Sequence, residues 1–299
     1  MSLFKGKKRV AGNGGVSRAY VNNSITSSVS NPNLIDNPDF KINQRGLSVY
    51  PGGAGGYTVD RWLANGSVTV TPTDTGISIE YGDTAEVGYR NIYTKVEDIN
   101  RFKGKYLTFS AMINGGVVLK CTGLVPIDIE DNYKIAAASL SDEINIRLQY
   151  HVELGEHVLC VIEGATTVEW AKLELGTNAT TFVAPDPATE LMKCQRYFCT
   201  GRFTFNMQDA YYSKDFAVIP MVKFPIDMRV TPTVVIHSDA GTPNTVSVWA
   251  DRTDSTTYRT CVARTLNPSG FSALGVTDES FSDVDPRFYL GYYTASADL

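Results

Sequence analysis

The fold of this chain is decided by the stretch Val168-Glu169-Trp170-Ala171-Lys172-Leu173-Glu174-Leu175-Gly176 and by the residues that follow it. Polar and apolar residues alternate through this stretch until it stops at a glycine, a pattern that is typical of a β-strand. A segment containing Pro185 and Pro187 comes next, and then a run with helical spacing. β-patterned sequence lies on both sides. We therefore expect the stretch to be the last strand of one β domain, joined by a short helix to a second β domain.

The region before this strand, residues 31–185, has the pattern of an antiparallel jelly-roll sandwich. Short alternating runs recur with turn signals between them, and no helical period interrupts them. Asn114-Gly115-Gly116 predicts a hairpin turn. About seven to nine strands in roughly 150 residues are typical of a two-sheet sandwich. Near the start of the region, Phe40 and Ile42 predict a short strand. Trp62 is expected in the core, with an exposed sugar-stacking role as the alternative.

A short connecting helix is predicted over residues 186–198. Asp186 can cap its start, Pro187 suits a first helical turn, and an apolar stripe is expected at Leu191, Cys194 and Phe198. A helix of two to three turns is not stable alone. It must therefore pack against something, and a neighbouring copy of the chain is one candidate.

The sequence returns to β patterning over residues 199–299, which we expect to form a second, C-terminal β-sandwich domain. Two prolines in 224–236 bar that segment from being a long central strand. Phe288, Leu290 and Tyr292 predict a closing aromatic strand. Its turn-rich parts would be available for binding.

Residues 1–30 are polar and contain few large apolar side chains, so they cannot bury enough surface to fold alone. Two interpretations are open. The segment is a disordered tail, or it is an extended arm that becomes ordered against a larger assembly. A chain that continues into rigid β domains often uses such an arm as an anchor.

The composition excludes several classes of function. The net charge of the 299-residue chain is −5, and its one basic cluster lies near the start, so binding to nucleic acid has little support. No apolar run approaches the 18 residues that a membrane-spanning helix needs. The five cysteines are odd in number and scattered, which indicates reduced thiols rather than a disulfide framework: Cys121, Cys160, Cys194, Cys199 and Cys261.

The sequence offers no catalytic or metal site, so we expect no enzyme and no cofactor. His151 and His157 are six residues apart, which matches neither a zinc-protease helix nor a zinc finger, and they suit a polar hairpin tip. No Gly-x-Ser-x-Gly elbow is present. Calcium could in principle be held by oxygen ligands, but no EF-hand spacing is found around the candidate acids Asp36, Asp39 and Asp60.

Binding to a glycan needs less machinery than catalysis. Exposed aromatic rings stack on the apolar faces of sugars, and nearby polar groups supply hydrogen bonds. The candidates lie in turn-rich parts of the C-terminal domain: Tyr211, Tyr212, Trp249, Tyr258 and Arg259. For Trp249 a place in the core is the alternative interpretation.

Several short motifs resemble a family of bacteriophage fibre and receptor-binding proteins. They recur in order from about residue 31 to the carboxyl end: NLIDNPDF (33–40), NQRG (43–46), YTVDRW (57–62), WAKLELG (170–176), Ala179-Thr180, Glu190-Leu191, CQRYF (194–198), Phe224-Pro225, Met228-Arg229, Thr231-Pro232-Thr233 and ASADL (295–299).

This resemblance implies a virion surface protein, a homotrimer whose first domain is similar to a carbohydrate-binding-module jelly roll and whose last is a distal β domain. Residues 1–30 would attach to another virion protein of the tail, baseplate or capsid, through Phe4, Lys5, Lys7, Lys8 and Arg9. The protein would be made in the host cytoplasm and would adhere to a bacterial surface glycan. Two alternatives stay open: a head-attached decoration fibre with incidental glycan binding, and a glycan-modifying depolymerase.

Overall fold

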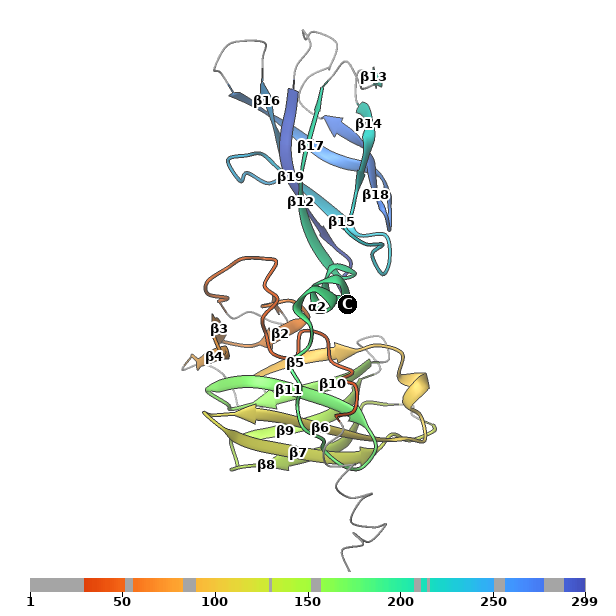
Figure 1. The fold of residues 1–299 in the computed structure, drawn as a ribbon. Helices are drawn as coiled ribbons and strands as arrows, with labels where there is room; N and C mark the ends of the chain where they lie inside the picture. Colours follow the sequence, from red (N-terminus) through yellow and green to blue (C-terminus); the bar gives the residue numbers. More distant parts are fainter. Residues whose placement is uncertain are drawn as a thin grey trace, which may run out of the picture.

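The computed structural model describes residues 30–51, 56–82, 90–128, 131–151, 157–206, 211–213, 216–249, 256–276 and 288–298. These residues form two β-rich lobes, one above the other, with a single α-helix beside the narrow region between them (Figure 1). Every strand pairing in the described ranges is antiparallel. The mainly β, antiparallel architecture expected from the sequence is therefore confirmed.

The first lobe contains two sheets that enclose one core. The six-stranded sheet has the order β1-β2-β5-β10-β9-β8, formed by β1 Gly56–Tyr57, β2 Trp62–Asn65, β5 Asn91–Val96, β10 His157–Glu163, β9 Asn145–His151 and β8 Tyr133–Ser139. The five-stranded sheet has the order β3-β4-β11-β6-β7, formed by β3 Val68–Thr73, β4 Gly76–Tyr81, β11 Thr167–Leu175, β6 Tyr106–Ile113 and β7 Val117–Leu124. A 3-10 helix, η1 Ile99–Phe102, follows β5.

The core between these sheets comes from alternate residues of each strand. Phe109 of β6, Leu148 of β9 and Leu173 of β11 are all fully buried. Burying one such side chain contributes about 1.5–3 kcal/mol, which is why the period-2 patterns predict the strands well. Trp62 is also fully buried, so the core interpretation of this residue is confirmed. The hairpin at Asn114-Gly115 is found as predicted, with both residues at positive φ.

The second lobe is one continuous sheet that curls into a nearly closed barrel, which differs from the expected two-sheet sandwich. Its order is β12-β19-β16-β17-β18-β14-β13, and β15 also pairs with β19. The strands are β12 Phe198–Asn206, β13 Tyr211–Ser213, β14 Phe216–Lys223, β15 Thr233–His237, β16 Thr245–Trp249, β17 Thr256–Asn267, β18 Gly270–Val276 and β19 Phe288–Ser296. The aromatic strand β19 pairs with three strands, so it joins what would otherwise be separate sheets.

The connecting helix, α2 Pro187–Gln195, is shorter than the predicted 186–198. Asp186 caps it as expected, accepting a hydrogen bond from the Thr189 backbone N–H at 2.8 Å. The predicted apolar stripe is only partly right. Cys194 is buried, but Leu191 is half-buried and Phe198 begins β12. The other buried helical side chain is the charged Glu190, at 1% exposed.

The strand predicted at Phe40 and Ile42 is wrong. Both residues lie in an irregular segment, where Phe40 has a φ of 60° and Asn37 a φ of 51°. Phe40 is nevertheless buried and packs against Trp62, with ring centroids 4.6 Å apart. Alternation over only two apolar residues cannot distinguish a strand from a buried turn.

Candidate functional site

The five glycan-binding candidates lie in two groups on the second lobe. Tyr211 and Tyr212 are in β13, which pairs with β14. Trp249, Tyr258 and Arg259 are on the neighbouring strands β16 and β17, and β18 and β14 separate them from β13. The side chain of Tyr258 is 51% exposed, and that of Arg259 is half-buried. For Tyr211, Tyr212 and Trp249 the structure describes the backbone alone. The sheet therefore does not bring all five residues to one point.

A further exposed aromatic residue lies beside this second group. Phe288 pairs with Trp249 across β19 and β16, and 55% of its side chain is exposed. The sequence places Phe288 in an aromatic strand but gives no signal of which of its rings faces solvent. The predicted attachment residues Phe4, Lys5, Lys7, Lys8 and Arg9 lie outside the described residues.

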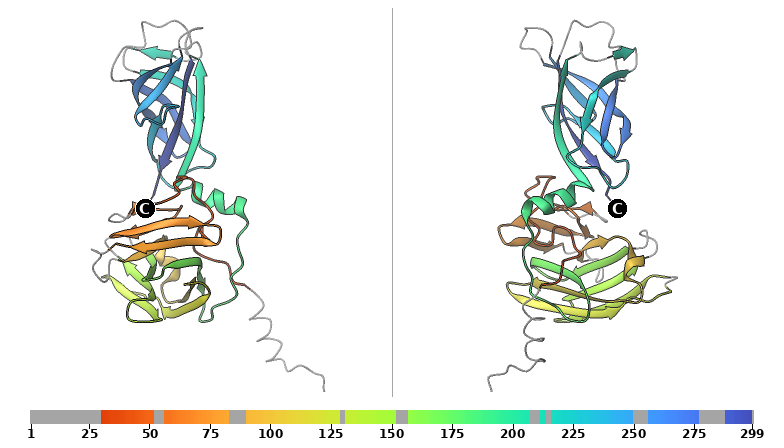
Figure 2. Two further views of the ribbon diagram at one scale, coloured as in Figure 1. Left: turned by 90° about the vertical axis from the view of Figure 1, so that its left-hand side faces the viewer. Right: turned by 45° about the vertical axis from the view of Figure 1, so that its right-hand side comes forward.

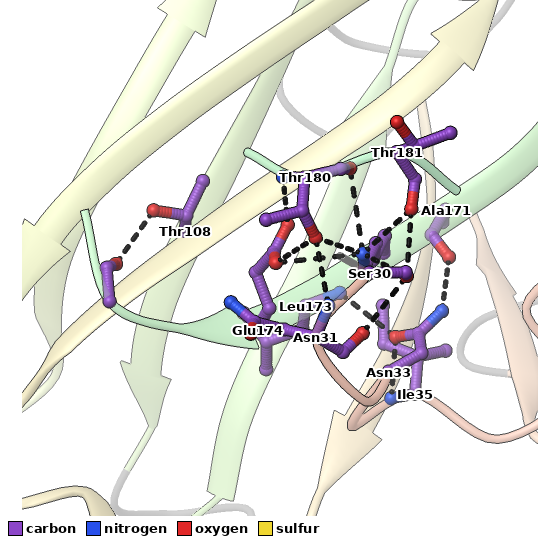
Figure 3. Close-up of polar contacts among 12 residues, drawn as sticks. Ser30, Asn31, Asn33, Ile35, Thr108, Ala171, Leu173, Glu174, Thr180 and Thr181 are labelled. Atoms are coloured by element: carbon purple, nitrogen blue, oxygen red, sulfur yellow. Dashed lines mark hydrogen bonds and ion pairs between the residues drawn. The ribbon is translucent and has the colours of Figure 1, made fainter. Parts of the chain in front are cut away.

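Residues 30–33 are fastened to the first lobe by a buried polar cluster (Figure 3). The Lys172 ammonium, 1% exposed, donates to Ser30 Oγ at 3.0 Å, Thr180 Oγ1 at 2.6 Å and the Thr181 carbonyl at 3.0 Å. Its carboxylate neighbour Glu174, fully buried, lies 3.5 Å away and accepts from the Thr180 backbone N–H and hydroxyl.

Asn33 completes the fastening of this segment. Its Oδ1 accepts from the backbone N–H groups of Leu173 and Ile35, and its Nδ2 donates to the Ala171 carbonyl at 2.9 Å. The outer face of β11 is therefore covered by two chain segments that are far apart in sequence. We call this set, Ser30, Asn33, Lys172, Glu174 and Thr180, the tether.

A second polar network joins the two lobes, and Asn37 is its first centre. The Asn37 backbone N–H donates to the Glu190 carboxylate of α2 at 2.6 Å, and its carbonyl accepts from the Trp62 indole at 2.9 Å. Its side-chain amide donates to the carbonyls of Ile42 and Asp60. One asparagine therefore holds the helix, the loop before β1 and the start of β2 together.

Asp60 is the second centre, at 1% exposed. Its carboxylate accepts from the backbone N–H of Gln44 at 2.6 Å and from the Gln44 amide at 2.9 Å. The same amide donates to the Phe198 carbonyl of β12 at 2.7 Å, which links the lobes directly. Arg45 Nη1 lies 4.0 Å from Asp60. Burial raises the pKa of Asp60, although the hydrogen bonds from Gln44 oppose that shift.

Two arginines then clamp the second lobe to the first. Arg45 pairs with Asp298 at 2.5 Å, and its guanidinium stacks over the Phe198 ring at 4.0 Å from the centroid. Arg61, 4% exposed, lies 3.4 Å from the Asp36 carboxylate and 3.5 Å from the centroid of the Tyr197 ring. We call this whole contact region the joint: Asp36, Asn37, Gln44, Arg45, Asp60, Arg61, Glu190, Tyr197, Phe198 and Asp298.

The joint also bounds a cleft of about 290 Å³ between the first lobe and α2. The first lobe lines it with Arg61, residues 95–98 at and after the end of β5, and Arg101 of η1, and the helix side lines it with Lys193, Arg196 and Tyr197. Burial lowers the pKa of Lys95, and the adjacent Arg61 lowers it further. The sequence contains these residues as scattered single charges, with no motif that predicts a shared cleft.

Neither a metal centre nor a membrane span is evident in the described parts of the chain. Within the described ranges there is no group of three or more His, Cys, Asp or Glu side chains placed to hold a metal ion. Asp36 and Asp60, considered above as calcium ligands, face Arg61 and Gln44 instead. Among the described helices none has the length and apolarity to cross a membrane. Comparisons with protein-family models, curated proteins and solved structures found no match to this chain.

Proposed function

We propose that this chain is a non-enzymatic structural protein of a bacteriophage virion. In this proposal, three copies form a fibre or spike at the virion surface, and residues 1–30 attach it to another virion protein. The first lobe is a jelly roll of the carbohydrate-binding-module type. The second lobe is presented outward to adhere to a glycan of the host surface.

The observation that carries the proposal is the joint. A flexible segment would be enough to keep two β lobes in one chain. Here, instead, buried polar contacts fix the linking helix and the chain segments on both sides of it. Buried hydrogen bonds and ion pairs favour one relative geometry of the groups that they join. The joint therefore suits a protein that presents its distal lobe at a fixed distance and angle.

The position of the tether agrees with such a role. The described chain begins low on the first lobe, away from the second lobe, and it is held there by Lys172 (Figures 1 and 2). A virion contact made through residues 1–30 would then attach the molecule by the end opposite the distal lobe. Tyr258 and Phe288 are exposed on that distal lobe, as an adhesive surface requires.

The motifs that resemble the fibre family also have a physical role. Residues of NLIDNPDF, NQRG, YTVDRW and CQRYF meet in the joint, where they supply Asn37, Gln44, Asp60, Arg61 and Tyr197. Such residues must be retained together if the two lobes are to keep one arrangement. The resemblance therefore includes the joint, which determines how the two lobes are arranged.

Trimerisation would cover an apolar surface on the second lobe. Val218 of β14, Met221 of β14 and Val262 of β17 are 42%, 40% and 38% exposed. The register places Val218 beside Ala273 of β18, with Val262 one row away on the same outer face, which also carries Arg264 of β17. Three linked copies would raise the apparent affinity for a repeated glycan without any new contact.

The mass of the full chain in solution tests the assembly. We expect about three times 32.7 kDa. Val262→Glu should lower that mass to the monomer value, whereas Thr204→Glu, at an exposed position of β12, should leave it unchanged. A monomer at all concentrations would contradict the trimer.

Binding to host glycans tests the role. We expect the full chain to bind isolated surface glycan without releasing new reducing ends, and Tyr258→Ala or Phe288→Ala to weaken the binding. Release of reducing ends would favour the depolymerase alternative.

A truncated chain tests the attachment. A chain that lacks residues 1–29 should still bind glycan but fail to join particles. The site where the full chain attaches would distinguish a tail fibre from a head fibre.

A further inference from the structure

The cleft beside the joint is the strongest unassigned feature of the described structure. It is preformed, because its two walls are fixed by contacts that do not depend on a ligand. The Arg229 backbone N–H donates to the Arg196 carbonyl at 2.8 Å, and the Arg229 guanidinium lies 3.1 Å from the Glu97 carboxylate. Glu190 holds Lys193 at 3.0 Å on the helix side. A preformed cavity costs a ligand less ordering than one that must assemble around it.

The charges in this cleft are unlike those of the chain as a whole. Five cationic residues and three acids line it, although the chain has a net charge of −5. Two of the three acids already face an arginine, since Asp36 lies 3.4 Å from Arg61 and Glu97 lies 3.1 Å from Arg229. The third acid, Asp98, is exposed. The cleft is therefore electropositive.

Burial, and then the nearby cations, lower the pKa values of two neighbouring groups. Burial lowers the pKa of His157, and Lys95, Arg229 and Arg61 lower it further, while Glu97 alone among its close charges opposes them. Burial and the Arg61 charge also lower the pKa of Lys95. A bound anion would relieve the repulsion that both groups experience.

Arg101 and Arg196 are the cations best placed to receive a ligand. Both side chains are exposed and line the cleft, Arg101 from η1 and Arg196 from the end of α2. Neither makes an ion pair within the described residues. A guanidinium binds a carboxylate through two parallel hydrogen bonds, which makes arginine suited to recognising such a group.

We infer that this cleft binds one acidic sugar unit of a host glycan through its carboxylate, with Arg101 and Arg196 as the recognising groups. The cavity of about 290 Å³ lies at the small end of ligand pockets, so it suits a single unit rather than a long chain. The inference rests on the proposed glycan adhesion and adds to it a substrate class and a second place of contact. The distal lobe would hold the chain of the glycan, and the cleft would select for its charge.

Calorimetric titration of the full chain with glucuronic acid, and with glucose as the matched neutral sugar, tests this site. We expect binding of glucuronic acid that weakens as salt is raised, and no binding of glucose. Arg101→Gln and Arg196→Gln should each weaken it about tenfold or more, the effect of losing a charge-assisted hydrogen bond. Arg202→Gln, at an exposed position of β12, is the control and should bind as the parent does.

Each other outcome overturns a defined part of the proposal. Failure of glucuronic acid to bind, or binding that survives both substitutions, would exclude the site. Acetate or inorganic phosphate binding as tightly as glucuronic acid would show a bare anion site and exclude the sugar. A chain that adheres to neutral glycan through Tyr258 but ignores glucuronic acid would remove the cleft and leave the proposed function intact. A monomeric chain that binds glucuronic acid would leave the cleft as a binding site and contradict the proposed trimeric function.

Discussion

Arg45 and Asp298 face each other across the joint although 253 residues separate them in sequence, with Nη2 2.5 Å from Oδ2. Arg45 belongs to the loop before β1, and Asp298 follows β19 of the second lobe. The same guanidinium lies over the Phe198 ring at the start of β12. One side chain of the first lobe thus contacts the start of β12 and the residue that follows β19 by two positions.

Replacing Arg45 by Gln should destabilise the protein. Breaking a buried ion pair from one side costs about 3–5 kcal/mol. Solvent reaches 16% of the Arg45 side chain and 11% of that of Asp298, so we expect a loss of about 2 kcal/mol. Urea denaturation measures it. Arg202→Gln is the matched control and should change the free energy of unfolding by less than about 0.5 kcal/mol. An equal effect of the two substitutions would mean that the pair does not hold the lobes.

The tether makes a prediction about a buried pair. Lys172→Met leaves the Glu174 carboxylate buried without its cation, which should cost about 3–5 kcal/mol. Adding Glu174→Gln removes that charge while keeping an acceptor for the Thr180 N–H, so the double variant should recover part of the loss. Lys120→Met, on the exposed side of β7, is the control. Additive losses in the double variant would contradict the coupling between Lys172 and Glu174.

Strand positions were predictable from the sequence wherever apolar residues alternate over three or more positions. Ile146, Leu148 and Tyr150 form the inner face of β9 as expected, because one face of a sheet must be buried. The helix was predictable from its cap at Asp186. The closure of the second lobe was not, because it depends on β19 pairing with β12, β15 and β16, which is a matter of contacts between distant segments.

The joint and the cleft were harder to predict than the strands. Glutamate is rarely buried, yet Glu190 is, because its carboxylate accepts a hydrogen bond from the backbone N–H of Asn37, 153 residues away. Composition and period carry no information about such a partner. The aromatic candidates for glycan binding were chosen by residue type. Phe288 was not among them although it is exposed, because residue type does not predict which strand ends the fold leaves uncovered.

His157 should give the protein a dependence on pH. Its pKa is lowered from 6.5 by burial and then by Lys95, so the folded state disfavours the imidazolium. Folded chains therefore bind fewer protons than unfolded ones in this range. The stability contributed by neutral His157 is complete above pH 6.5 and is lost as the pH falls through the lowered folded-state value.

Comparison with His157→Gln isolates this contribution. Below pH 6.5 the free energy of unfolding of the parent should fall more steeply than that of the variant, and the imidazole NMR signals of His157 should titrate below 6.5. Lys95→Met should move that titration upward, because it removes the second-largest cause of the shift. An imidazole that titrates at or above 6.5 would contradict the buried, cation-facing position.

The thiols should be inert in the folded protein. All five are buried and unpaired, and burial raises the pKa of Cys121, Cys199 and Cys261 to about 12. The reactive species is the thiolate, which is then scarce at neutral pH. We expect a colorimetric disulfide reagent to modify the native chain slowly and to reach five thiols per chain only after unfolding in urea.

Cys194 lies on α2 beside the joint, whereas Cys121 lies in the first lobe's core. Arg45→Gln should therefore increase the rate of modification of Cys194 before that of Cys121. Equal rates at the two cysteines would show that loosening the joint opens the whole chain rather than the contact between its lobes.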